Sequence, residues 1–422
     1  MGYGARTLAA LVLLTTGIAV AQDPGGKAGA RDFTLLPPCP GIEVTAERAK
    51  VTLARTTVAK VAKGRRFGVR ERKAGAFQIQ VFSGKTLRYG WIASTDVREL
   101  ADADVDLAAE ALAIAKELTP TADVAALQAQ VDALTAQVTR AAEGANAPLA
   151  KARAVQRVLF RQERFAYQKA AHPLDGVLEH KRGNCLSLSL LYLAVSRDLD
   201  LPLRGVSVPK HAFLRCEDAA KPFWIEPSMG GILVSDSYVR GRYGGEGKTP
   251  PKLLSHLELI GLVLSQTAND LALKGDRERA CQLFARAAEL APRNGENYNN
   301  WGSCLLTLDR NPQAAAMLAR AVECDPSNLG ARSSWAVALS KMGQTRSAAA
   351  QFARITEIDP KHGDAWFNWG TTLLRMGRTG EAREKFARAV ALKPQLKPYV
   401  DDMLRQSPGQ FDNRTWKPSV PR

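Results

Sequence analysis

Residues 183–195 read Gly-Asn-Cys-Leu-Ser-Leu-Ser-Leu-Leu-Tyr-Leu-Ala-Val. Gly183 and Asn184 interrupt the preceding structure, and an almost wholly apolar run begins at Cys185. A helix that is apolar on every side is a buried one, so we expect a central helix of the fold to begin at this cysteine. A thiol in the first helical turn lies at the positive end of the helix dipole, which favours the thiolate. Cys185 is therefore the candidate nucleophile.

Two strands predicted downstream carry the partners that a thiolate nucleophile needs. Residues 205–216 indicate a strand, a short break and a second strand that contains His211. Side-chain alternation puts His211 and Cys216 on opposite faces of that strand, so Cys216 is interpreted as a packed thiol. The following strand contains Glu226, which can pair with His211 and orient its ring. We therefore predict a site formed by Cys185, His211 and Glu226.

Two stretches carry a family resemblance: VLEHKRGNCLSLSLLYLAVSRDLDLPLRGVSVPKHAFLRC, which ends at Cys216, and FWIEPSMGG, which contains Glu226. They resemble the transglutaminase-like superfamily, in its SirB-type bacterial branch. The resemblance extends over residues 153–243 and implies a papain-like fold with an ordered Cys, His and acid triad, here Cys185, His211 and Glu226. The family acid is more often Asp, and Glu is one methylene longer, which shifts the carboxylate.

Structural interpretations compete with each of these assignments. A buried cysteine is usually a packing residue, and a histidine on a strand is usually a surface or satisfied core residue. Asn184 either helps to stabilise an oxyanion beside the Cys185 backbone N–H or caps the helix. The other histidines lack a comparable sequence context: His172, His180, His256 and His362.

Cysteine spacing bears on metals and on disulfides. The six cysteines are Cys39, Cys185, Cys216, Cys281, Cys304 and Cys324. They form no Cys-x-x-Cys pair and, with only five histidines, fit no metal-binding pattern. We therefore predict neither a metal nor an organic cofactor. Cys281 and Cys304 lie on consecutive predicted helices and allow two interpretations, a disulfide or a pair of packed thiols.

The C-terminal part of the chain is periodic. Prolines recur every 34 residues, at Pro292, Pro326, Pro360 and Pro394. The small and large apolar residues with the same period are Ala280, Ala314, Ala348, Ala382, Phe284, Leu318, Phe352 and Phe386. Small residues let two helices cross closely, large ones fill the space beside them, and each proline ends the second helix. The pattern resembles the tetratricopeptide repeat and predicts four copies over 261–394, with a C-terminal helix and tail over 395–422.

The N-terminus has the pattern of a secretory signal peptide over residues 1–21. Arg6 precedes an apolar run from Leu8 to Val20, which ends in a small-x-small cleavage site before Gln22. The run is too short for a comfortable transmembrane helix, although an uncleaved anchor is the alternative interpretation. We therefore expect an exported, periplasmic or extracellular protein with no integral membrane segment after cleavage.

A linker and a small β domain are expected next. Residues 22–38 are rich in glycine, proline and small residues and indicate the linker. Residues 39–100 contain short β runs separated by glycine and lysine. These runs resemble a bacterial SH3-like β-barrel at Gly64, Gly90 and Trp91.

Basic residues are concentrated in this β region. Residues 31–100 contain 14 Lys and Arg against 6 Asp and Glu, which is a net charge of +8 within a chain of net charge +16. This excess favours a cell-wall or other anionic envelope polymer as a partner, and a simple structural spacer is the alternative. Nucleic acid is not an expected partner, because export argues against it and the aromatic residues occupy repeat-packing positions.

The remaining segments complete the predicted fold class. Residues 101–148 are alanine-rich with apolar residues at helical spacing, and they indicate a helical segment. The transglutaminase-like domain is expected over 149–260. The chain is thus predicted to be a multidomain α+β protein with an SH3-like β-barrel, a helical segment, a papain-like core and an α-solenoid of tetratricopeptide repeats.

Two functions fit these predictions. The first is an exported cysteine hydrolase or acyltransferase (a protease, amidase or transamidase) that acts on amide bonds of a protein or cell-wall peptide. In it Cys185 attacks the carbonyl, His211 transfers the proton and Glu226 orients His211. The second is a non-catalytic envelope adaptor that binds proteins on the concave surface of its repeats.

Overall fold

The computed structural model describes residues 41–405, apart from 54–55, 63–64, 84–85, 102–104, 171–172, 219–220 and 244–250. Several predictions from the sequence lie outside these residues: the signal peptide, the linker, Cys39, Gly64, His172 and the tail beyond residue 405. Among the described residues, none of the helices is long and apolar enough to cross a membrane.

The N-terminal β region forms two antiparallel sheets. The strands are β1 (Gly41–Val44), β2 (Arg48–Leu53), β3 (Thr56–Ala62), β4 (Arg66–Gly68), β5 (Glu71–Lys73), β6 (Ala76–Ser83), β7 (Thr86–Ala93) and β8 (Val97–Leu100). Their orders are β4-β1-β8 and β3-β2-β7-β6-β5. Alternate apolar residues, Ile42, Ile79 and Ile92 among them, form the shared core.

The predicted closed barrel is not observed in the described strands. Both neighbours of β1 are in the smaller sheet, because Ile42 pairs with Phe67 on one side and Glu99 on the other. The larger sheet ends at β5, a three-residue strand whose side chains are all exposed. Within the described residues the two sheets therefore stay separate.

The helical segment packs into the central core. It contains α1 (Leu107–Leu118), α2 (Val124–Ala141), α3 (Pro148–Gln156) and the π-helical turn η3 (Arg157–Gln162). Asp106 and Asp123 cap α1 and α2, since their carboxylates accept hydrogen bonds from Ala109 N and Ala126 N. The apolar stripe of α2 belongs to the same core as α5.

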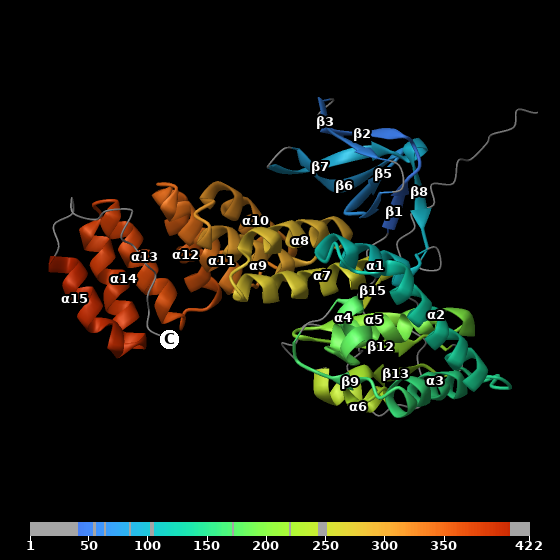
Figure 1. Ribbon diagram of the computed structural model, residues 1–422. Coiled ribbons are helices and arrows are strands. Elements are labelled where there is room, and N and C mark those ends of the chain that lie inside the picture. Colours follow the sequence, from blue (N-terminus) through green and yellow to red (C-terminus); the bar gives the residue numbers. More distant parts are fainter. Residues whose placement is uncertain are drawn as a thin grey trace, which may run out of the picture. The chain divides into compact units, whose positions relative to one another are not determined.

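The central domain has a five-stranded antiparallel sheet with helices packed on it (Figure 1). The sheet order is β14-β13-β12-β11-β15. The strands are β11 (Leu203–Val208), β12 (His211–Cys216), β13 (Phe223–Glu226), β14 (Ile232–Val234) and β15 (Lys252–Leu254). The helices are α4 (Leu174–His180), α5 (Cys185–Val195) and α6 (Asp236–Tyr243), and a short parallel pair joins β9 (Ala166–Tyr167) to β10 (Arg182–Gly183).

The two faces of this sheet have different neighbours. Leu214, Cys216 and Ile225 belong to the same apolar core as α5. Phe213 and Trp224 lie on the other face, with ring centroids 5.5 Å apart. Strand alternation thus puts Cys216 in the core and leaves the face of His211 to aromatic and polar groups.

The repeats form successive helix pairs (Figure 1). Their helices are α7 (His256–Leu273), α8 (Arg277–Leu290), α9 (Gly295–Thr307), α10 (Asn311–Cys324), α11 (Leu329–Lys341), α12 (Thr345–Ile358), α13 (Gly363–Arg375), α14 (Thr379–Leu392) and α15 (Lys397–Arg405). Each periodic proline stands two residues after the second helix of a pair, and the four periodic alanines are fully buried. The 34-residue period thus corresponds to one helix pair.

Candidate active site

Cys185 is the first residue of α5, and the cap of this helix fixes its place. Asn184 Oδ1 accepts a hydrogen bond from Ser187 N at 3.0 Å, and Ser187 Oγ accepts one from Asn184 N at 3.0 Å. This reciprocal capping box satisfies donors that the first helical turn would otherwise leave unpaired. Asn184 therefore caps the helix, the second of its two predicted roles. The Cys185 side chain is half-buried.

His211 is the first residue of β12, directly after a tight turn. The preceding residue, Lys210, has a φ of 64°, which is the left-handed region and lets β11 reverse into β12 over two residues. The ring Nε2 of His211 lies 2.7 Å from Glu226 Oε2. The Glu226 carboxylate is only 3% exposed, so this hydrogen bond forms away from water.

Glu226 is itself held by a neighbour that the sequence analysis did not single out. Its Oε1 accepts a hydrogen bond from Ser228 Oγ at 2.7 Å and one from Ser228 N at 3.3 Å. The extra methylene of glutamate therefore does not take the carboxylate out of reach of His211. The sequence contains a local indication of this contact, because Ser228 follows Glu226 by two residues and a hydroxyl at that spacing can hydrogen-bond to the carboxylate across a turn.

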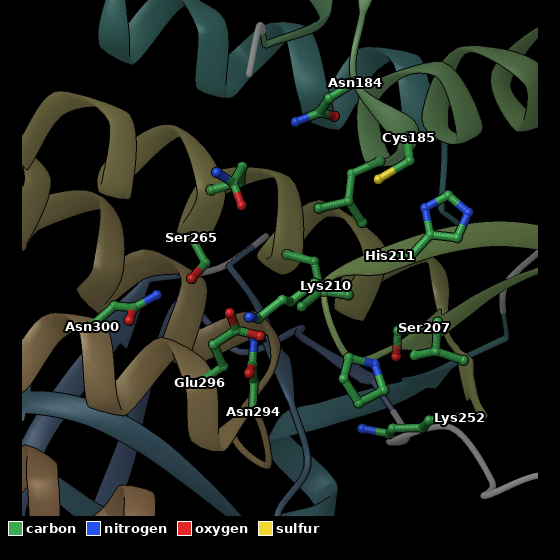
Figure 2. Close-up of a pocket in the computed structure, with 15 residues that line it drawn as sticks. Asn184, Cys185, Ser207, Lys210, His211, Lys252, Ser265, Asn294, Glu296 and Asn300 are labelled. Atoms are coloured by element: carbon green, nitrogen blue, oxygen red, sulfur yellow. The ribbon is translucent and has the colours of Figure 1, made fainter. Parts of the chain in front are cut away.

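The thiol completes the arrangement. The Cys185 side chain lies close enough to the His211 ring to raise the pKa of that ring, and Figure 2 shows both residues at the same end of the cavity. Since Nε2 pairs with Glu226, Nδ1 is the nitrogen left for the thiol. The structure thus brings Cys185, His211 and Glu226 together, with His211 hydrogen-bonded to Glu226, and their catalytic role stays a prediction.

The surroundings of His211 favour its charged form. Burial lowers the pKa of the ring, but the hydrogen bonds with Cys185 and Glu226, together with the Glu226 charge, outweigh it and raise the pKa to about 9. At neutral pH the ring is therefore an imidazolium. A protonated imidazole next to a thiol can give its proton to a leaving group, which is the role of the histidine partner of a cysteine nucleophile.

Two aromatic rings, those of Tyr243 and Phe213, pack against the imidazole ring of His211. Tyr243, at the end of α6, stacks on His211 with ring centroids 5.8 Å apart and an interplanar angle of 24°. Phe213 lies 5.7 Å from the same ring and stacks on Tyr243 at 5.2 Å. Tyr243 was not predicted, since no periodic pattern indicates which residue of α6 packs over β12.

Comparison with known proteins agrees with this domain organisation. Residues 125–258 match the transglutaminase-like superfamily. Residues 266–328 and 334–397 match the tetratricopeptide repeat. The chain thus contains a transglutaminase-like domain followed by tetratricopeptide repeats. Neither match extends to the N-terminal sheets, so the SH3-like assignment and the SirB-type branch stay predictions.

Relatives and solved structures cover parts of the chain. Two proteins of Xylella fastidiosa, strains Temecula1 and 9a5c, are each described as a UPF0162 protein. Each is 25% identical over 223 residues, which are 49% of this chain and 79% of the relative. A structure titled "YrrB: a TPR protein with an unusual peptide-binding site" is 27% identical and covers 35% of this chain and 79% of its own, with a TM-score of 0.32. MamA of Desulfovibrio magneticus RS-1 is 20% identical and covers 33% and 83%, with a TM-score of 0.31.

Two cavities flank the histidine of the transglutaminase-like domain. The first, of about 360 Å³, contains the Cys185 thiol and extends to the helices of the first repeats. The second, of about 300 Å³, lies against Glu226, Ser228 and Tyr243. His211 lines both cavities, so the ring separates the thiol side of the site from the carboxylate side.

The other candidate groups are placed away from this chemistry. In the described ranges no cluster of three or more His, Cys, Asp or Glu side chains could hold a metal ion. Cys216 is buried, and burial raises the pKa of its thiol to about 11. Cys281 Sγ and Cys304 Sγ are 3.6 Å apart, well beyond a disulfide bond of about 2.05 Å, so they are a pair of packed thiols.

Proposed function

We propose that the protein is an exported cysteine-dependent acyl-transfer enzyme that acts on amide bonds of protein or peptide substrates. One observation carries the proposal. The thiol at the start of α5 and the His211 ring line one cavity, and the buried Glu226 carboxylate is hydrogen-bonded to that ring. Cys216, in the same domain, is different from Cys185. It is buried, has no histidine partner among the described residues and does not line that cavity.

The first half of the reaction forms an acyl-enzyme. The Cys185 thiolate attacks the carbonyl carbon, and the oxyanion that forms lies at the positive end of α5, where the Cys185 backbone N–H can donate to it. The His211 imidazolium then gives its proton to the amine nitrogen as the C–N bond breaks. The products are a Cys185 thioester, a neutral imidazole and a free amine.

The second half returns the enzyme to its starting state. Neutral His211 takes a proton from water or from an acceptor amine, whose oxygen or nitrogen attacks the thioester carbonyl. The C–S bond breaks, and the thiolate and imidazolium are restored. Water makes the protein a hydrolase and an amine makes it a transamidase, with the same residues in the same roles. Glu226 stabilises the imidazolium and keeps Nε2 occupied.

Export and targeting are part of the proposal. Residues 1–21 support passage through a secretory route. The tetratricopeptide repeats support a protein partner, because such arrays bind peptides on their concave surface. An adaptor without catalysis needs only the repeats, whereas the enzyme needs an activated thiol.

Alkylation kinetics distinguish these functions. Iodoacetamide at pH 7 should label Cys185 at least about 10-fold faster than a cysteine of the urea-denatured chain, because a neighbouring histidine such as His211 activates a cysteine nucleophile. Labelling sites are assigned by mass spectrometry, and Cys216 is the internal control that should stay unlabelled while the protein is folded. A Cys185 rate equal to that of the denatured chain would contradict the enzyme and favour the adaptor.

A further inference from the structure

The cavity beside Cys185 is lined by residues of the transglutaminase-like domain and by residues of the first repeats. We infer that the first tetratricopeptide repeats form half of the substrate pocket, and that Glu296 and Asn300 select an extended polypeptide segment with a basic side chain. The inference rests on the proposed function, since it names the substrate class of the same thiol site. It assigns to the repeats a part in substrate selection next to the reacting bond.

The walls of the cavity come from both regions. Cys185 and His211 line it from the transglutaminase-like domain. Ser265, from α7, and Glu296 and Asn300, from α9, line it from the repeats. Figure 2 shows these two groups at opposite ends of the cavity. Any substrate that fills the volume next to the thiol therefore contacts the repeats.

The repeat wall is held firmly against the domain. β15 pairs with β11 through Gly205 and Leu254, and it leads directly into α7. Ser255 caps α7 in a reciprocal box with Glu258, and Lys252 Nζ pairs with the buried Glu258 Oε1 at 2.6 Å. Apolar residues of α7 belong to the same core as α5. The wall formed by α7 therefore keeps its position relative to Cys185.

The start of α9 is equally well anchored. Asn294 Oδ1 caps the helix by accepting a hydrogen bond from Asn297 N at 3.2 Å. The fully buried Asn297 donates its Nδ2 to Phe284 O on α8 at 3.0 Å. Glu296 stands between these two fixed residues, so its carboxylate is presented to the cavity by a rigid helical turn.

The chemistry of the lining matches a polypeptide. Carboxamide and hydroxyl groups line the repeat side, and each can both donate and accept hydrogen bonds, as a peptide backbone does. A volume of about 360 Å³ falls within the range of ligand pockets, which suits a short segment of chain. An extended polypeptide is therefore the class of substrate that this lining fits.

Glu296 gives the pocket its charge preference. Within the described residues its exposed carboxylate forms no ion pair or side-chain hydrogen bond, and it lines the cavity from the first turn of α9. A basic side chain of the substrate would supply the missing partner. Lys210 extends from the β11–β12 turn toward α9, and Figure 2 shows its side chain ending on the same side of the cavity as Glu296.

The test uses small peptide chloromethyl ketones, which alkylate the thiol with loss of chloride. Probes with Lys, Gln or Glu at the first or second residue before the ketone are compared on the full chain, with iodoacetamide alongside. The variants are Glu296→Gln and Asn300→Ala. The matched control is Glu278→Gln, because Glu278 is also an exposed glutamate in the first turn of a repeat helix but lies outside the cavity.

The expected result is a substrate-dependent effect. Wild type should prefer the Lys probe over the Glu probe, and Glu296→Gln should slow the Lys probe about 3- to 10-fold, as an exposed charge pair allows. Asn300→Ala should slow all peptide probes. Iodoacetamide rates should not change in either variant, and Glu278→Gln should match wild type throughout.

Two failures are distinguishable. Slow iodoacetamide labelling of wild-type Cys185 would overturn the proposed function itself. Fast iodoacetamide labelling, with peptide-probe rates that are equal in wild type, Glu296→Gln and Asn300→Ala, would overturn the pocket inference and leave the activated thiol intact. Both substitutions are at partly or fully exposed positions, so far-UV circular dichroism should confirm that the variants fold.

Discussion

The transglutaminase-like domain and the repeat array are stabilised by different kinds of contact. In the repeats, residues at a fixed period of 34 pack helix against helix, and alanines such as Ala314 and Ala348 are fully buried. In the domain, the site depends on a few polar contacts between elements with no common period, such as the pair of His211 and Glu226. A packing defect in the array should therefore lower stability, whereas a defect in the polar chain should lower reactivity first.

The largest effect is expected at the thiol. Cys185→Ala removes the nucleophile, so acyl-enzyme formation and turnover of p-nitrophenyl acetate should fall about 10³-fold or more. Cys216→Ala removes a buried thiol on the opposite strand face and should leave the rate per folded molecule unchanged. Ester hydrolysis and intact-protein mass spectrometry measure both. Retained acylation in Cys185→Ala would place the nucleophile elsewhere.

The next effect is expected at the carboxylate. Glu226→Gln keeps the shape of the side chain but removes its charge, so the pKa of His211 should fall from about 9 toward its ordinary value near 6.5. The alkylation rate of Cys185 at pH 7 should drop about 10- to 100-fold, within the usual range for acid–base partners. NMR titration of the ring and the pH profile of alkylation report the change. Ser228→Ala keeps the charge and should have a smaller effect.

The same pair has a definite pH signature in stability. Because the folded pKa of His211 lies above its unfolded value, the pair stabilises the fold fully below about pH 6.5 and loses this contribution as the pH rises through about 9. The difference in Tm between wild type and Glu226→Gln should therefore be largest near pH 6 and smallest near pH 10. A difference that grows with pH would contradict this sign.

A smaller effect, on stability alone, is expected in the array. Ala314→Leu forces extra volume into a fully buried helix crossing and should cost about 1–3 kcal/mol in the free energy of unfolding. Ala316→Leu, two residues further along α10 and exposed, is the matched control and should stay within about 0.5 kcal/mol of wild type. Urea denaturation measures both. Equal losses of unfolding free energy in the two variants would show that Ala314 is packed no more tightly than Ala316.

The smallest effect is expected at the cap of α5. Asn184→Ala removes the side-chain acceptor of the capping box and should cost about 1 kcal/mol. The alkylation rate of Cys185 should change only slightly, because the oxygen of Asn184 is engaged by the helix and not by the reacting group. A rate loss as large as that of Glu226→Gln would instead indicate a direct role in the reaction.

The sequence predicts what depends on local or periodic patterns. Cys185 stands at a helix start because an apolar run follows a helix-breaking pair, and the burial of Ala280 or Phe352 follows from the repeat period. Strand alternation correctly separates His211 from Cys216. The pairing of Glu226 with His211 could also be predicted, because the two residues lie on strands that follow each other in the sequence.

The rest depends on how distant elements pack. Tyr243 stacks on His211 because α6 folds back over the sheet, and no spacing in the sequence encodes that return. Glu296 lies more than 100 residues beyond Cys185 and reaches the same cavity only through the course of α7, α8 and α9. The separation of the N-terminal sheets was missed because alternating short strands are compatible with both a closed barrel and two open sheets.

The position of helix α7 also determines which fragments of this protein can fold. Its apolar residues Leu257, Ile260 and Leu264 complete a core that begins in the transglutaminase-like domain, while its most extensive contacts are with α8. A fragment that stops before His256 would expose this core to water, and a fragment that starts there would carry an uncovered apolar face. Limited proteolysis should therefore spare the junction at Ser255, and the shortest soluble piece that contains Cys185 should extend at least through α8.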